Sequence, residues 1–229
     1  MKYAVICFTE RGAWVCRRLF HKLREAGGEC EAVVPGRFLR EEWKKEGMKE
    51  LGGEPLSQWT GRMFAEKRGM IFVGAAGIAV RAIAPWVRDK MTDPPVVSVD
   101  EGARFVIPLL SGHVGGANGL ARRIAEWLRS TPVITTATDV NGKFAVDLFA
   151  SVYHMVITDR KEAKNISAAV LEGKHIGVFS DLPLKTLPEG FILGKHLEKN
   201  IQITVNTELM PDSLRLVPKA VILGVGCRR

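Results

Sequence analysis

The chain has 229 residues, of which 46% are hydrophobic, 25% charged and 7% aromatic. These values are typical of a folded globular protein and exclude a disordered or collagen-like chain. No apolar run reaches the roughly 20 residues that a membrane-spanning helix needs, so we expect a cytoplasmic protein. The length allows one large domain or two small ones.

The net charge of +8 is spread evenly, as +4 over residues 1–70, +1 over residues 71–150 and +3 over residues 151–229. Nucleic-acid binding favours a concentrated basic face, so this spread argues against a nucleic-acid partner. It permits attraction of an anionic small molecule. The four cysteines form no Cys-x-x-Cys pair, so we expect free thiols and no metal site.

Strands alternate with helices through the first 140 residues. Short β-branched runs predict strands at 3–8, 30–34, 70–73, 96–99, 104–110 and 132–136. Apolar periodicity predicts helices at 13–26, 55–67, 78–87 and 116–128, with a surface connection at 37–54. Thr9 is expected to cap the first helix, and Asp100 to Gly102 to form a hairpin-like turn. The alternation predicts an α/β fold with a Rossmann-like, doubly wound, mainly parallel sheet.

The pattern changes near residue 140, where a second, smaller α/β unit is expected to begin. Helices are predicted at 145–155 and 160–171, and strands at 175–179, 201–205 and 214–218, with an irregular segment at 180–194. Residues 221–225 are typical of a strand that runs into a glycine turn. The predicted domains are therefore 1–140 and 141–219, and we interpret 220–229 as the start of a C-terminal domain that is cut short.

A first candidate binding loop contains Gly74, Ala75 and Gly77, which follow a strand and open a helix. Small residues let the backbone approach a ligand, and the N–H groups at a helix start bind anions. Arg81 follows in the first turns and is suited to pairing with a carboxylate. The loop lacks the G-x-G-x-x-G spacing, so a Rossmann-type oxidoreductase is the weakest alternative. A tight packing turn is the structural alternative.

A second glycine-rich loop follows the strand at 104–110. Its small and polar members are Ser111, Gly112, Gly115, Gly116 and Asn118. His113 is flanked by small residues, so its ring is as suited to acid/base chemistry as to a structural role. No G-x-S-x-G elbow is present, and Ser111 is therefore expected to be a binding hydroxyl or a helix cap rather than a nucleophile.

Acidic and hydroxyl side chains follow two further strands. Thr136 and Asp139 follow the strand at 132–136, and Asp100 and Glu101 follow the strand at 96–99. If the strands are parallel neighbours, three loops converge on one cleft at the carboxyl ends of the strands. These are the two glycine-rich loops and the segment that holds Thr136 and Asp139. Asp100 or Glu101 is then a candidate general base for water, and His113 a candidate acid or base. A plain turn is the alternative role for Asp100 and Glu101.

Three long strings in this region are distinctive: GAAGIAVRAIAP at 74–85, DPPVVSVDEGARFVIPLLSGHVGGANGLARRIA at 93–125 and PVITTATDVNGKFAVD at 132–147. They resemble the cobalt-precorrin-5A hydrolases of anaerobic cobalamin biosynthesis. Residues 1–73 and 148–219 fit the family more loosely. The tail LGVGCRR at 223–229 resembles the opening of the family's C-terminal domain.

The resemblance implies hydrolysis of the δ-lactone of cobalt-precorrin-5A, with release of acetaldehyde and formation of cobalt-precorrin-5B. Cobalt belongs to this anionic corrinoid substrate, a tetrapyrrole, so no separate cofactor or metal is implied. The loops at 74–77 and 111–118 are expected to bind substrate carboxylates or the lactone oxyanion. Water then attacks the lactone carbonyl with help from Glu101 or His113. A non-catalytic corrinoid-binding or partner-docking fragment is the alternative; a homodimer and transient contacts with other enzymes of the pathway stay open.

Overall fold

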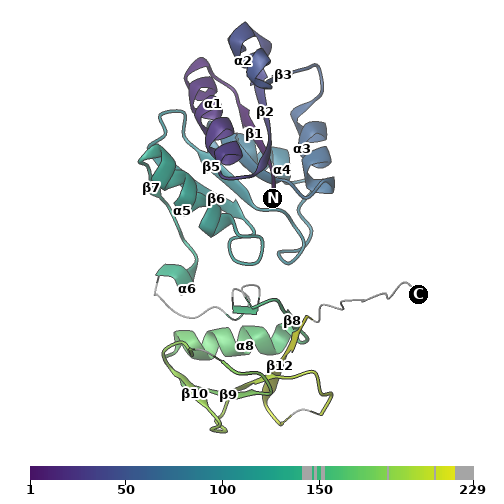
Figure 1. Ribbon diagram of the computed structural model, residues 1–229, viewed down its shortest axis with the longest axis vertical. Helices are drawn as coiled ribbons and strands as arrows, with labels where there is room; N and C mark the ends of the chain where they lie inside the picture. Colours follow the sequence, from purple (N-terminus) through teal and green to yellow (C-terminus); the bar gives the residue numbers. More distant parts are fainter. Residues whose placement is uncertain (141–145, 147–148, 151–152, 185, 209, 220–229) are drawn as a thin grey trace, which may run out of the picture. The chain divides into compact units, whose positions relative to one another are not determined.

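The structure, a computed structural model, describes residues 1–140, 146, 149–150, 153–184, 186–208 and 210–219 (Figure 1). It divides into two compact units, Met1–Ile134 and Thr135–Arg229. Each unit is built on its own β-sheet, of seven strands in the first and five in the second. No helix among these residues is long and apolar enough to cross a membrane. The strand predicted at 221–225 lies outside the described residues.

The first sheet is mainly parallel and has the strand order β3-β2-β1-β4-β5-β6-β7. Its strands are β1 (Lys2–Cys7), β2 (Glu29–Pro35), β3 (Lys49–Leu51), β4 (Gly69–Val73), β5 (Val96–Val99), β6 (Phe105–Leu110) and β7 (Thr131–Pro132). β1 to β5 run in the same direction, β6 runs antiparallel to β5, and β7 is parallel to β6. The first unit is therefore a mixed α/β sheet in which the last two strands are reversed.

Helices cover both faces of this sheet (Figure 1). They are α1 (Glu10–Glu25), the 3₁₀ turn η1 (Gly36–Phe38), α2 (Glu41–Glu46), α3 (Leu56–Ala65), α4 (Ala76–Ile83) and α5 (Ala117–Leu128). Alternate residues of β1 point to opposite faces. Val5 packs in a core with α1 and α5, and Ile6 packs in a second core with α3 and α4. Thr9 caps α1 by accepting a hydrogen bond from Gly12 N, which confirms the predicted cap.

The sequence predictions for the first unit fail mainly at short elements. The surface connection predicted at 37–54 contains α2 and the three-residue edge strand β3. The helix predicted to reach residue 87 ends at Ile83, two residues before Pro85. The strand predicted at 132–136 is reduced to the two residues of β7.

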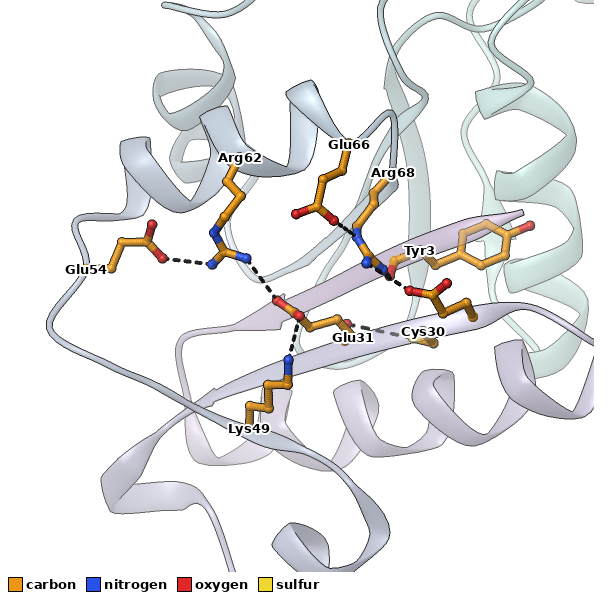
Figure 2. Close-up of polar contacts among 9 residues, drawn as sticks. Tyr3, Cys30, Glu31, Lys49, Glu54, Arg62, Glu66 and Arg68 are labelled. Atoms are coloured by element: carbon orange, nitrogen blue, oxygen red, sulfur yellow. Dashed lines mark hydrogen bonds and ion pairs between the residues drawn. The ribbon is translucent and has the colours of Figure 1, made fainter.

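A network of ion pairs ties α3 and the residues after it to the outer strands (Figure 2). Glu31 on β2 binds Lys49 Nζ at 2.8 Å and lies 3.7 Å from Arg62 on α3. Arg68 has a side chain that is only 10% exposed, and it donates to Glu29 at 2.9 Å and to Glu66 at 2.5 Å. The pair between Glu31 and Lys49 adds a side-chain contact to the backbone pairing of β2 with β3.

The second unit has a five-stranded mixed sheet of order β10-β9-β11-β12-β8. Its elements are α6 (Ala137–Val140), β8 (Met155–Ile157), α8 (Arg160–Leu171), β9 (Ile176–Ser180), β10 (Phe191–Leu193), β11 (Asn200–Ile203) and β12 (Ser213–Pro218). β8 is the antiparallel member. The helix predicted at 160–171 is confirmed. Within the helix predicted at 145–155, residues 146, 149 and 150 are helical, residues 153 and 154 form a turn, and Met155 begins β8. The other five residues lie outside the described residues. β10 lies within the segment that was expected to be irregular.

Candidate functional site

The loop after β4 and the turn after β5 lie side by side at one edge of the first sheet. β4 and β5 are parallel neighbours in which Val73 pairs with Val99, so both connections begin at the same edge. The Gly74 N–H donates to the Val99 carbonyl oxygen at 2.8 Å. Gly74 has a φ of 153°, and a Cβ there would lie 3.0 Å from Phe8 Cδ2, so the position requires glycine. We call this edge, which includes Thr9, the carboxyl edge.

Glu101 has a defined position at the carboxyl edge. Its Oε2 accepts a hydrogen bond from Thr9 Oγ1 at 2.7 Å, and Thr9 Oγ1 in turn accepts from Gly12 N at 3.0 Å. Thr9 follows β1, which lies beside β4 at the point where the strand order reverses. Ligands of open α/β sheets bind outside the strand ends at such a point. The carboxylate of Glu101 is exposed and therefore lies where a ligand or water can reach it.

Asp100, the other predicted base, holds the β5–β6 turn together. Its carboxylate accepts hydrogen bonds from three backbone N–H groups, those of Phe105 at 2.6 Å, Arg104 at 2.7 Å and Gly102 at 3.2 Å. Partial burial raises the pKa of Asp100, but the hydrogen bonds from Phe105 and Arg104 outweigh it and hold the pKa below its ordinary value. This geometry matches the turn role considered for Asp100 above.

Two arginines lie at or near the carboxyl edge, and the sequence predicts only one of them as a site residue. Arg81 lies on α4 as predicted, is exposed, and reaches the Gly77 carbonyl oxygen at 3.3 Å. Arg11, in the first turn of α1, was not predicted as a site residue. Its Nη2 would lie 3.5 Å from a Cβ at Gly102, so its guanidinium stands beside the turn that carries Glu101. The sequence holds no signal for this contact, because 90 residues separate the two segments.

The second glycine-rich loop lies at the opposite edge of the sheet. β6 is antiparallel to β5, and Leu110 at its end pairs with Val96 at the start of β5. The loop at 111–118 therefore begins at the end of the sheet away from Gly74 and Glu101. The expectation that three loops converge on one cleft is wrong, because it required parallel strands on both sides of β5.

Ser111 opens this second loop in a strained backbone conformation. Its φ is 57°, in the left-handed region that non-glycine residues rarely occupy. The side chain is buried, and Oγ has no hydrogen-bond partner among the residues described. A Cβ at Gly115 would lie 2.4 Å from Ser111 Cβ, so the Ser111 side chain faces the interior of the loop. Strain of this kind is concentrated at functional sites.

The rest of the 111–118 loop is a compact turn that starts α5. The Gly116 N–H donates to the His113 carbonyl oxygen at 3.0 Å, and Gly116 is the N-cap with a φ of 84°. The Asn118 side chain is buried against Gly112, where a Cβ would lie 2.8 Å from Asn118 Oδ1. The His113 side chain is half-buried. The loop thus brings together the predicted residues of its own segment and none from the carboxyl edge.

The remaining predicted residues belong to the second unit. Thr136 precedes α6, and Asp139 lies within it. Both residues therefore belong to neither edge of the first sheet.

Neither a metal-binding cluster nor a disulfide is found in the described part of the chain. No group of three or more His, Cys, Asp or Glu side chains there is arranged to hold a metal ion. Cys7, Cys16 and Cys30 are free thiols, as predicted, whereas Cys227 lies outside the described residues. Burial raises the pKa of Cys30 to about 12, which makes it unreactive at neutral pH.

A small cavity in the first unit lies away from both glycine loops. Its volume is about 110 Å³, and its lining includes Glu31, Lys49, Trp59 and Arg62. The charges that line it are largely paired with one another (Figure 2). None of the site residues predicted from the sequence lines this cavity.

Comparison with known families gives two adjacent matches. The family described as "Cobalamin synthesis G N-terminal" matches residues 58–139. The family described as "Cobalamin biosynthesis central region" matches residues 144–217. Both glycine-rich loops and Glu101 fall within the first match, and most of the second unit falls within the second.

Full-length relatives agree with these matches. The chain is 36% identical over 242 residues to cobalt-precorrin-5A hydrolase of Salmonella typhimurium, which covers 99% of this chain and 66% of that protein. It is 33% identical over 248 residues to cobalt-precorrin-5A hydrolase of Priestia megaterium, which covers 99% of this chain and 65% of that protein. The chain thus spans just under two thirds of these relatives.

A solved structure shows the same fold. The crystal structure of a cobalamin biosynthesis protein G homolog from Sulfolobus solfataricus superposes with a TM-score of 0.54 at 22% sequence identity. The match covers 95% of this chain and 60% of that one.

Proposed function

The chain belongs to the cobalt-precorrin-5A hydrolase family, of which it carries the N-terminal and central regions, and on that premise we propose its reaction. The proposed reaction is hydrolysis of the δ-lactone of cobalt-precorrin-5A to cobalt-precorrin-5B, with release of acetaldehyde. Cobalt is bound in the substrate and stays bound in cobalt-precorrin-5B, so the proposed reaction requires no metal held by the protein.

The observation that carries the proposal is the hydrogen bond of 2.7 Å between Thr9 and Glu101 at the carboxyl edge. It orients a carboxylate beside the loop at 74–77, where the chain order of the sheet reverses. The same strand order supports a Rossmann-like, doubly wound reading of the first unit. Glu101 acts as the base that activates water, and the start of α4 with Arg81 receives substrate carboxylates.

The chemistry balances with one water molecule. Glu101 takes a proton as the water oxygen adds to the lactone carbonyl, and the ester C–O bond then breaks to leave a carboxylate and an alkoxide. The alkoxide oxygen becomes the carbonyl oxygen of acetaldehyde as the adjacent carbon–carbon bond breaks. The electron pair of that bond passes to the macrocycle, which is then protonated.

Anaerobic incubation of the purified chain with cobalt-precorrin-5A, followed by an assay for acetaldehyde, tests this assignment. We expect release by the unchanged chain, and a loss of about a hundredfold or more in Glu101→Gln because a general base supplies roughly that factor. Arg18→Gln, on the exposed surface of α1, is a matched control that should leave the rate unchanged. Full activity in Glu101→Gln would refute the role of Glu101.

His113 is the competing candidate from the opposite edge. Since the two residues lie at different ends of the sheet, single variants separate them. His113→Ala is expected to keep acetaldehyde release. A loss in His113→Ala with full activity in Glu101→Gln would move the reaction to the 111–118 loop.

A non-catalytic corrinoid-binding or partner-docking role is the second candidate. The chain spans 66% and 65% of the two cobalt-precorrin-5A hydrolases that it matches. Under this alternative the chain binds cobalt-precorrin-5A without releasing acetaldehyde. The same incubation, combined with a binding measurement, distinguishes the two functions.

A further inference from the structure

We propose that the 111–118 loop and the adjoining turn at 88–93 form a separate anion-binding site, at the opposite edge of the first sheet from Glu101. The site takes an oxyanion, either a carboxylate or a phosphate group. It is defined by Ser111, Gly115, Arg88, Lys90 and the start of α5. It does not depend on the reaction proposed for Glu101.

The first support is the Ser111 hydroxyl. The Ser111 residue is only 8% exposed, and its Oγ has no hydrogen-bond partner among the described residues. Leaving a buried hydroxyl unpaired costs free energy, and an oxyanion that accepted a hydrogen bond from this O–H group would offset that cost. The side chain faces Gly115, where a Cβ would also lie 2.9 Å from the Ser111 carbonyl oxygen. Any larger residue at Gly115 would therefore clash with Ser111.

The second support is the position of the loop at the start of α5. This helix has 12 residues, and its N-cap, Gly116, contributes no side-chain hydrogen bond. The positive end of the helix dipole favours an anion within the first turn. The helix and the Ser111 hydroxyl thus present positive charge and a donor to the same loop.

The third support is a neighbouring turn that carries two exposed cations. The buried carboxylate of Asp93 accepts hydrogen bonds from Arg88 N at 2.8 Å and Asp89 N at 3.1 Å, which fixes the turn. The Asp93 carbonyl oxygen would lie 3.3 Å from a Cβ at Gly115, so the turn abuts the loop. The side chains of Arg88 and Lys90 are exposed and make no ion pair with any residue in the described ranges.

Most other charged side chains of the first unit form ion pairs or hydrogen bonds with residues of the same unit. Arg62 and Arg68, for example, are held by carboxylates in the network of Figure 2. Asp89 faces the same turn, and its Oδ1 accepts from Met91 N at 2.9 Å. Arg88 and Lys90 are therefore the cations of this turn that remain available to an anionic group, beside the carboxylates of Asp89 and Asp93.

Nuclear magnetic resonance titration of the full chain tests this site. Amide signals of Gly112, Gly115 and Gly116 are followed as inorganic phosphate or, anaerobically, cobalt-precorrin-5A is added. We expect saturable shifts. The double variant Arg88→Gln with Lys90→Gln should weaken binding about tenfold, since exposed charge pairs each contribute little. The matched control Arg18→Gln should leave binding within about twofold.

The outcomes separate the source of the anion. Shifts with phosphate alone assign a free phosphate group, and shifts with cobalt-precorrin-5A alone assign a carboxylate of that molecule. No shift at these glycines with either ligand would overturn the site, as would equal binding by the double variant. Glu101→Gln should keep the shifts while it loses acetaldehyde release, so failure of this site and failure of the proposed reaction are distinguishable.

Discussion

Replacing Ser111 with glycine is expected to stabilise the first unit. A left-handed φ such as the 57° of Ser111 costs a non-glycine residue about 1 kcal/mol. The buried, unpaired hydroxyl costs about 1–3 kcal/mol more. Glycine has more conformational freedom in the unfolded chain, and this lowers the gain in stability by roughly 0.5–1 kcal/mol. We therefore expect the free energy of unfolding to rise by about 1–3.5 kcal/mol.

Urea unfolding followed by tryptophan fluorescence measures this change in the first unit alone. All five tryptophans belong to Met1–Ile134, at positions 14, 43, 59, 86 and 127. Ser111→Ala is the control, because it removes the hydroxyl but keeps the strained backbone. It should gain less stability than Ser111→Gly. A decrease in stability for Ser111→Gly would refute the reasoning, since it would mean that neither strain nor an unpaired hydroxyl is present.

A gain in stability from Ser111→Gly also bears on function. Strain and buried unpaired groups persist in proteins mainly where an activity needs them. The stabilised variant is accordingly expected to bind phosphate or cobalt-precorrin-5A more weakly at the glycine amides. Unchanged anion binding together with higher stability would show that the Ser111 hydroxyl contributes nothing to the site.

Three further predictions concern side chains that hold the first unit together. Asp100→Asn should lower stability by about 1 kcal/mol, because it weakens three hydrogen bonds from backbone N–H groups, while acetaldehyde release persists. A full loss of activity at unchanged stability would instead give Asp100 a catalytic role. Arg68→Met should lower the urea midpoint, with a loss of about 2 kcal/mol, because a 10% exposed guanidinium loses its hydrogen bonds. A loss near zero would show that the ion pairs are immaterial. Arg17, by hydrogen bonding, lowers the pKa of Glu46 from 4.5 to about 2. The stabilisation is thus complete above pH 4.5 and lost as the pH falls towards 2, so wild type and Glu46→Gln should differ most near neutral pH and converge in acid.

The sequence predicts the longer elements well because their buried apolar residues recur at a regular spacing along the chain. The apolar spacing of 160–171 and its Asp159 cap define α8, and a continuous apolar run defines β4. The three residues of β3 carry no such pattern. Their place in the sheet is set by pairing with β2, a tertiary contact that no local pattern signals.

The candidate site is predicted only in part, for a similar reason. The glycine-rich loops and Glu101 follow strand ends that the sequence locates. Thr9 meets Glu101 across 92 residues, and no local pattern signals that contact. The direction of β6, in contrast, was accessible: residues 100–103 are too few for a parallel crossover, so the predicted hairpin already required antiparallel strands.

The reversal of β6 makes the two edges of the first sheet thermodynamically independent. A strand of six residues such as β6 is about 20 Å long, so Glu101 and Ser111 share no partner and are too far apart for direct coupling. In a double-mutant cycle, Glu101→Gln and Ser111→Gly should change the free energy of unfolding additively, to within about 0.5 kcal/mol. Each edge can therefore be altered by mutation without correcting for the other.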